Sequence, residues 1–298
     1  MTRGQQFLAR LRAGDTMVAD GATGTLLQSM GLENGQAPEA WVLEKPERIR
    51  ALYQSYVDAG SDLFLTCTFG GTRYRLENHG LEDRVHEINR RAAELARDVA
   101  GDEVFVAGDM GPTGKLLRPL GPLTKEEMTA AFAEQAAGLA AGGVDFLLIE
   151  TMSDLGEAQA AITGARQAAD LPIICTFSFD THGRTMMGTK PREVAETIGP
   201  LVEGIGANCG KDPAEYVGFI QAMRQAAPDA ILWAKPNAGL PHLEVGEVVY
   251  DATPEFMADV AHQLRQAGAQ VIGGCCGTTP THITAMARRL EQGESSGG

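Results

Sequence analysis

Short apolar runs rich in β-forming residues recur eight times along this chain of 298 residues, and a segment able to form a helix follows each. The runs are Thr16–Asp20, Asp62–Phe69, Val104–Asp109, Val144–Thr151, Pro172–Phe179, Gly204–Cys209, Ile231–Pro236 and Ala269–Gly273. Strands that alternate with helices form parallel sheets, and eight such units close into a barrel. We therefore predict an α/β fold, a single (β/α)8 TIM barrel. An open doubly wound sheet is the structural alternative.

The predicted helices have apolar positions three and four residues apart, and most begin at proline or at Ser, Thr or Asp. They are Pro46–Ala59, Leu81–Val99, Lys125–Ala141, Ser153–Ala168, Pro191–Val202, Pro213–Ala226, Pro254–Ala267 and Pro280–Leu290. No long linker or change of composition divides the chain, which suits the roughly 250 residues of one barrel. The predicted domain is 1–290, and 291–298 form a polar tail.

The charge of the chain excludes several classes of partner. A formal net charge of −14 repels polyanions, so we expect no nucleic acid and no anionic membrane surface as partner. No apolar run approaches the roughly 20 residues that span a bilayer, and residues 1–14 lack a hydrophobic signal core. A cytoplasmic location is the default expectation. Five cysteines are too few for a disulfide framework, and reduced thiols favour metal binding or catalysis.

Polar, glycine-framed motifs stand where the predicted strands end, which is where barrel enzymes carry their active sites. They are Asp20-Gly21-Ala22-Thr23-Gly24-Thr25, Thr66-Cys67-Thr68-Phe69-Gly70-Gly71, Gly108-Asp109-Met110-Gly111-Pro112-Thr113-Gly114, Glu150-Thr151, Asn208-Cys209-Gly210, Lys235-Pro236-Asn237-Ala238-Gly239 and Gly273-Gly274-Cys275-Cys276-Gly277. The chemistry of the protein is therefore expected at one end of the barrel.

Three of the five thiols follow the sixth and eighth predicted strands. Adjacent side chains of a regular strand point to opposite faces, but the glycines around Cys275 and Cys276 permit a backbone on which both sulfurs converge. With Cys209 they form a three-sulfur site, which suits Zn²⁺ and leaves a fourth position open, as in catalytic zinc sites. Packing as small hydrophobic residues, or a vicinal disulfide, is the alternative for these thiols. Packing is favoured for Cys175 and Cys67.

Two acids and a lysine also lie at strand ends. Asp20 and Glu150 end the first and fourth strands, where carboxylates could bind a substrate ammonium group or be satisfied by backbone amides. The glycine-rich turn after Asp20 could offer N–H groups to a substrate carboxylate. Lys235 suggests a rival chemistry, a Schiff-base lyase or aldolase, which would leave the three cysteines unexplained.

Together these motifs resemble those of the zinc-dependent homocysteine S-methyltransferases, and the likeness runs from about Asp20 to Ile283. The most specific part is Asn208-Cys209 combined with the Gly273–Gly277 run. The motifs are most similar to the homocysteine domain of cobalamin-dependent methionine synthase, here as a stand-alone chain. Cys67 and Thr151 depart from the family pattern: Cys67 replaces a common asparagine, and Thr151 replaces a tyrosine of the betaine-dependent branch.

The resemblance implies a role for each motif. It implies Zn²⁺ held by three ligands, with the sulfur of homocysteine as the fourth; the ligands are Cys209, Cys275 and Cys276. It implies that residues near this metal bind the rest of the substrate. Asp20 and Glu150 would bind the amine, and the backbone of Gly21, Ala22 and Thr23 would bind the carboxylate. Asn208 is a further expected substrate-binding residue. Because zinc deprotonates a coordinating thiol, no separate catalytic base is expected.

The expected activity is transfer of a methyl group to the homocysteine thiolate to give methionine. An acidic mouth favours a small onium donor such as S-methylmethionine. The alternative is exchange of a methyl group with a separate corrinoid protein, in either direction. A non-catalytic zinc or thiol sensor is a further alternative.

Overall fold

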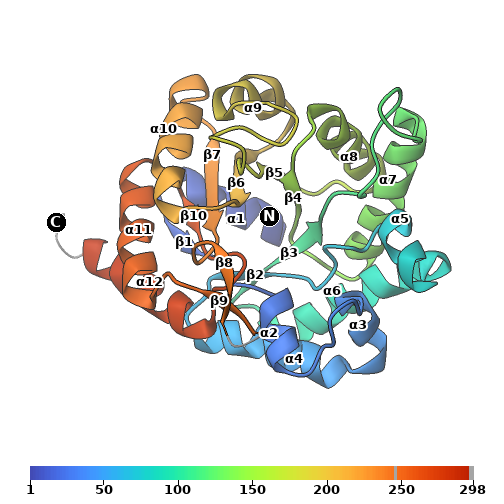
Figure 1. Ribbon diagram of the computed structural model, residues 1–298, viewed down its shortest axis with the longest axis horizontal. Helices are drawn as coiled ribbons and strands as arrows, with labels where there is room; N and C mark the ends of the chain where they lie inside the picture. The colour runs from blue at the N-terminus through green and yellow to red at the C-terminus, as the bar shows by residue number, and fades with distance from the viewer. Residues whose placement is uncertain (245–246, 295–298) are drawn as a thin grey trace.

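Eight parallel strands form the centre of the protein in the computed structural model, which describes residues 1–244 and 247–294 (Figure 1). The strands are β1 (Met17–Val18), β2 (Leu63–Leu65), β3 (Phe105–Met110), β4 (Phe146–Met152), β5 (Ile173–Phe177), β6 (Gly204–Cys209), β7 (Ile231–Pro236) and β10 (Val271–Ile272). Their order is β1-β10-β7-β6-β5-β4-β3-β2. A bridge between Ala19 and Leu63 joins the two ends of this order. The predicted single (β/α)8 barrel is confirmed.

Helices surround the barrel, as Figure 1 shows. They are α1 (Arg3–Arg12), α2 (Gly24–Ser29), α3 (Trp41–Glu44), α4 (Pro46–Asp58), α5 (Arg73–Leu76), α6 (Val85–Ala100), α7 (Lys125–Ala141), α8 (Leu155–Ala168), α9 (Pro191–Ile198), α10 (Tyr216–Ala226), α11 (Pro254–Gln266) and α12 (Pro280–Glu294), with short 3-10 turns at Pro38–Ala40, Glu77–His79, Glu82–Arg84, Gly199–Leu201 and Pro213–Glu215. Each of the eight predicted helices has a counterpart. Helix α12 continues to Glu294 and so includes the first part of the predicted tail, and 295–298 lie outside the described residues.

Local sequence signals explain where the major helices begin. Thr124 caps α7 by accepting a hydrogen bond from the Glu127 amide, and Glu127 accepts one from the Thr124 amide in return. Asp154 caps α8 through the Glu157 amide. Side-chain caps of this kind satisfy backbone donors that have no partner within the helix. Proline opens α4, α9 and α11, where its missing N–H costs nothing.

Side chains along each strand alternate between the barrel interior and the layer of helices. On β3, Phe105 and Ala107 belong to an inner apolar cluster, whereas Val106 packs in the outer cluster with helix residues. The inner cluster also contains Phe146, Leu148, Ile174, Ile231, Trp233 and Val271. Continued toward the carboxyl ends of the strands, this alternation turns a layer of buried polar side chains inward: Asp109, Glu150, Thr176, Asn208 and Lys235. The polar layer forms the floor of the mouth.

The opposite end of the barrel is closed by α1, which sequence reasoning did not identify. Phe7 is fully buried and stacks on Phe146, with ring centroids 4.1 Å apart and planes 5° from parallel. Arg3 reaches Asp145 at 3.1 Å, and Arg97 contacts the same carboxylate at 2.6 Å. These contacts fix the N-terminal segment across the base of the barrel.

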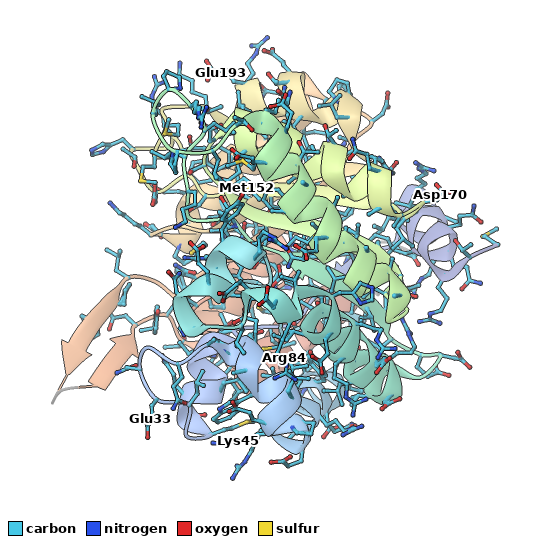
Figure 2. The ribbon with its side chains drawn as sticks, turned by 90° about the vertical axis from the view of Figure 1, so that its right-hand side faces the viewer. Glu33, Lys45, Arg84, Met152, Asp170 and Glu193 are labelled. Carbon is cyan, nitrogen blue, oxygen red and sulfur yellow. The ribbon has the colours of Figure 1, made fainter. Side chains whose placement is uncertain are left out.

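An antiparallel hairpin interrupts the loop after β7. Its strands are β8 (Pro241–Glu244) and β9 (Glu247–Tyr250). Figure 2 shows this hairpin projecting at one end of the barrel, at the left of the view, while α1 lies at the other end beside Asp170. Within the described residues, every helix is too short or too polar to cross a membrane.

Candidate metal centre and substrate cavity

Three thiols meet at the carboxyl-terminal mouth of the barrel. The Sγ atoms of Cys209, Cys275 and Cys276 all lie within 4.8 Å of one another. Cys209 is the last residue of β6, and the cysteine pair lies in the loop after β10. The structure therefore brings together the three thiols that the sequence predicted to be metal ligands.

The backbone around these thiols is held in place from several sides. Cys209 has a φ of +64°, a left-handed conformation that is uncommon for residues other than glycine. The Tyr216 hydroxyl donates to the Cys209 carbonyl, and Asn237 Nδ2 donates to the Gly210 carbonyl at 2.5 Å. These bonds stabilise the turn that aims the Cys209 sulfur at the other two.

The cysteine pair is attached to the loop after β7. The Cys275 amide donates to the Pro236 carbonyl at 2.8 Å, and the Ala238 amide donates to the Cys276 carbonyl at 2.9 Å. Consecutive side chains in this irregular backbone can face the same point, as the glycines around the pair predicted.

The three sulfurs shift one another's pKa values. Hydrogen bonds from the thiols of Cys275 and Cys276 lower the pKa of Cys209 to about 3. The corresponding bond to Cys209 raises the pKa of Cys275 to about 11, and bonds to both neighbours raise the pKa of Cys276. Because the three sulfurs lie within 4.8 Å of one another, a single cation can contact all of them. Zinc prefers sulfur ligands in sets of three or four, so the donor set fits it.

A cavity of about 670 Å³ opens beside the thiols. Its lining includes Gly21, Ala22, Thr23, Glu39, Cys67, Phe69, Arg75, Asp109, Glu150, Lys235 and Tyr250 together with the three cysteines. This volume lies within the range of about 300–1,000 Å³ typical of small-molecule sites. A Cβ atom at Gly21 would lie 2.8 Å from Thr278 Oγ1 and 2.9 Å from the Tyr56 ring, so only glycine fits there.

Asn208 organises the floor of this cavity. Its Nδ2 donates to Glu150 Oε2 at 3.3 Å and to Thr151 Oγ1 at 2.6 Å. Its Oδ1 accepts from the Thr151 amide at 2.8 Å and from Thr176 Oγ1 at 2.7 Å. Thr151 has a φ of +61°, and these bonds offset the strain of that conformation. Asn208 is fully buried, and the substrate-binding role predicted for it stays a prediction.

Burial controls the charge of Glu150. It raises the Glu150 pKa to about 8, with repulsion from Cys275 as the next cause. Lys235 acts in the opposite direction but is already engaged elsewhere. A bound cation beside Glu150 would favour its ionised form.

Lys235 and Asp20 form a buried ion pair, with Nζ 2.5 Å from Oδ1 and both side chains almost completely buried. Burial acts to lower the Lys235 pKa, but the charges of Asp20 and Glu150 outweigh it and the pKa is raised. A lysine held in its charged form is a poor nucleophile. The ion pair engages the Lys235 amine and gives no support to the Schiff-base alternative.

The other oxygen of Asp20 also has a partner, because Oδ2 accepts from the Leu65 amide at 2.9 Å. In the described part of the loop after β1, the residues that line the cavity begin at Gly21, so Asp20 is not among them. The role predicted for Asp20 at the substrate amine stays a prediction.

The structure also places the remaining cysteines and shows what sequence reasoning missed. Cys175 is fully buried in the outer core cluster, as predicted, and Cys67 packs in the same cluster while also lining the cavity. Asp109 and Tyr250 line the cavity but were not predicted as site residues. The glycine-framed run at the end of the third strand was a signal for Asp109, whereas Tyr250 depends on the unpredicted hairpin.

Fold and site together define a barrel protein with three clustered thiols at the carboxyl ends of its strands. Residues 17–290 match the family described as homocysteine S-methyltransferase. The chain belongs to this family.

Several relatives support this membership. Methionine synthases of Mycobacterium tuberculosis and Mycobacterium leprae are 32% and 33% identical to the chain. Each match covers 91% of the chain but only 24% of the relative, so the chain spans about a quarter of these relatives' length. The structure of the homocysteine methyltransferase MmuM from Escherichia coli in its metallated form gives a TM-score of 0.78 at 25% identity, covering 94% of this chain and 98% of that one.

Proposed function

We propose that the chain transfers a methyl group to the thiol of homocysteine, forming methionine, with zinc held by Cys209, Cys275 and Cys276. The observation that carries this proposal is the cluster of three thiols, all within 4.8 Å, at the edge of the mouth cavity. Three protein ligands leave a fourth position for a substrate sulfur. A bound zinc ion supplies Lewis acidity that lowers the pKa of a coordinating thiol.

The residues around the cavity support an amino-acid substrate. Glu150 is held by Asn208 and faces the cavity, so its carboxylate is proposed to receive the substrate ammonium group. The Ala22 amide already donates to Thr278 Oγ1 at 3.2 Å. Within the predicted Gly21–Thr23 turn, the Gly21 and Thr23 amides are therefore proposed to receive the substrate carboxylate. Fixing both ends of the amino acid would orient its sulfur toward the incoming methyl group.

The donor is proposed to be a small onium compound, with S-methylmethionine as the first candidate. The cavity has room for a small donor beside homocysteine. Acidic side chains of Glu39 and Asp109 line it and favour a cation. The likeness to the E. coli homocysteine methyltransferase over nearly the full length of both chains also supports a reaction completed on one barrel. A cytoplasmic location is proposed, since a reducing compartment keeps the three thiols available.

Two measurements test this proposal. Protein purified without chelators is expected to contain about one equivalent of zinc by elemental analysis. Homocysteine should then be methylated when S-methylmethionine is added, and methionine should appear in equal amount. Protein with no bound metal after zinc reconstitution, or with metal but no methylation of homocysteine by any donor, would contradict the proposal.

The alternative donor is a methylated corrinoid on a separate protein. The methionine synthases that resemble this chain are about four times its length, and this observation favours a reaction that uses further domains. A corrinoid is too large for the cavity and would have to approach the mouth from outside. Activity that appears only after a methylated corrinoid protein is added would establish this alternative.

A further inference from the structure

Arg75 is a cation in the wall of the mouth cavity, and its guanidinium has no partner. The residue lies on the short helix α5 and is half-buried. No hydrogen bond or ion pair joins its side chain to any residue that the structure describes. In the described lining the other lysine or arginine is Lys235, which is paired with Asp20 at 2.5 Å. The five N–H donors of Arg75 are therefore available to a ligand in the cavity.

Contacts that use none of these donors hold the Arg75 side chain against the cavity wall. Its Cζ atom lies 5.9 Å from the centroid of the Phe69 ring, which is a cation–π distance. A Cβ atom at Gly114 would lie 3.3 Å from Arg75 Nη1, so the guanidinium passes close to the backbone of the loop after β3. Phe69 also lines the cavity. The guanidinium is thus positioned at the cavity without being neutralised there.

Two acids interact with the charge of Arg75 but are bonded elsewhere. Glu39 accepts from the Gly70 amide at 2.6 Å, and Glu157 accepts from the amide and the hydroxyl of Thr113 at 2.8 and 2.6 Å. Burial raises the pKa of both carboxyls, and the opposing effect of Arg75 is smaller. A raised pKa favours the neutral acid, so these residues compensate Arg75 less than a bound anion would.

Arg75 and the thiols lie on different sides of the mouth. In the closed strand order β2 stands opposite β6, so Arg75, which follows β2, enters the cavity across from Cys209. Figure 1 shows α5 at the right of the view and β10, which precedes the cysteine pair, to the left of the barrel centre. β3 and β4 lie between β2 and β6 and bring the buried acids Asp109 and Glu150 to the cavity. The cavity therefore runs from thiols past two acids to a cation.

We propose that Arg75 binds a carboxylate of the methyl donor, and that the donor is therefore a zwitterion, an onium compound that also carries a carboxylate. This inference rests on the proposed function, because it names the class of donor used at that site. The methyl group on the onium centre must face the substrate sulfur, so the rest of the donor extends away from the thiols. Arginine binds a carboxylate through two parallel N–H bonds. S-methylmethionine belongs to this class, whereas trimethylsulfonium does not.

The test changes one charge on the protein and the matching charge on the donor. Rates of homocysteine methylation by zinc-loaded wild type and Arg75→Gln are measured with S-methylmethionine and with its amide, in which a neutral group replaces the carboxylate. The variant should show a KM for S-methylmethionine about 10- to 100-fold higher, the loss expected for hydrogen bonds to a charged group. Its KM for the amide should change by less than about 2-fold on the same argument. The kcat values should change little, because Arg75 does not touch the methyl group.

Arg73→Gln is the matched control. It removes a guanidinium from the same helix, but Arg73 is paired with Glu134 at 2.8 Å and does not belong to the described lining of the cavity. Both KM values should stay at the wild-type level. Arg75→Lys keeps the charge but loses the paired geometry, so it should recover part of the affinity for S-methylmethionine.

Homocysteine also carries a carboxylate, and calorimetry separates this source from the donor. Binding of homocysteine to zinc-loaded Arg75→Gln should stay within about 2-fold of wild type, because a charged hydrogen bond to this substrate would contribute more. A loss of homocysteine affinity instead would assign Arg75 to the thiol substrate and overturn the inference.

The remaining outcomes separate this inference from the proposed function. If zinc-loaded wild type methylates homocysteine with neither S-methylmethionine nor its amide, the proposed donor is wrong and this inference falls with it. If wild type uses S-methylmethionine but Arg75→Gln leaves its KM unchanged, or raises the KM equally for both donors, the inference alone is refuted. A rise confined to S-methylmethionine supports it.

Discussion

The two ends of the barrel are built on opposite principles. At the base, α1 covers the strands with stacked aromatic rings, and Asp145 contacts two arginines. At the mouth, three thiols lie within 4.8 Å of one another, and Thr151 and Cys209 have left-handed backbones. The contacts at the base join protein groups to one another, whereas the three thiols at the mouth line a cavity and remain available to a ligand. Stability and chemistry are therefore assigned to different ends, as in other barrels of this type.

The largest expected effect comes from removing a thiol at the mouth. Cys276→Ala should lose bound zinc and reduce methyl transfer more than about 100-fold, because even outer-shell partners of a metal contribute about 10- to 100-fold. Metal analysis and an activity assay measure both effects. The control is Cys175→Ala, which removes a buried thiol from the core and should keep its zinc. A fully metallated and active Cys276 variant would contradict the proposed metal centre.

The base is expected to respond in stability instead. Phe7→Ala removes a fully buried ring that stacks on Phe146, and a change of this kind costs about 3–5 kcal/mol of unfolding free energy. Denaturant titration measures this loss. Zinc stoichiometry in the folded variant should stay at the wild-type value. Loss of zinc from folded Phe7→Ala protein would show that packing at the base also determines metal binding at the mouth.

The same contrast explains how far the sequence predicts the structure. Alternating apolar runs and helices predicted the barrel, because each strand and helix is specified by its own short segment. The strands β1 and β2 are shorter than predicted, since the chain leaves the regular ladder where it turns into the mouth: the Cys67 amide donates to the Tyr53 hydroxyl. The packing of α1 across the base was missed because its partners, such as Phe146, lie far away in sequence.

The sequence predicted some residues of the site and missed the contacts of others. Glycines on both sides of Cys275 and Cys276 are a local signal, and these thiols were found. The pairing of Lys235 with Asp20 was not, because a contact between residues 215 positions apart depends on which way each strand faces. Asp109 was noted at a strand end, but its place in the cavity lining is visible only once the strands are arranged.

A buried charge at the mouth should cost stability when its partner is removed. Lys235→Met leaves Asp20 without its cation, and breaking a buried pair in this way costs about 3 kcal/mol or more. Adding Asp20→Asn should restore much of the loss, since the uncompensated charge is then gone. Unfolding free energies of the two proteins measure the effect. Equal unfolding free energies of Lys235→Met and wild type would show that the ion pair does not stabilise the fold.

A smaller effect is expected for the charged contact at the base. Asp145→Asn weakens the ion pairs with Arg3 and Arg97. It also weakens the hydrogen bond that the Val106 amide donates to the carboxylate at 2.8 Å. The arginines remain partly exposed, so solvent can replace part of the interaction and the loss should be about 1–2 kcal/mol. Denaturant titration measures it, and Arg10→Gln, which removes an exposed ion pair with Asp15, is the control. A loss of unfolding free energy as large as that of Lys235→Met would show that the ion pairs at the base and at the mouth contribute equally to stability.

A titration tests how pH acts on the mouth. Burial raises the Glu150 pKa from 4.5 to about 8, so between these values the folded protein holds a proton that the unfolded chain has released. The stability contributed by that proton is fully present below about pH 4.5 and is lost as the pH rises through about 8. Glu150→Gln keeps the hydrogen bond from Asn208 but cannot titrate. The difference in unfolding free energy between metal-free wild type and this variant should therefore shift in favour of the variant from about pH 5 to pH 8. A difference that stays constant over this range would mean that Glu150 is already ionised in the folded protein at low pH, and that the mouth holds its negative charge before any cation arrives.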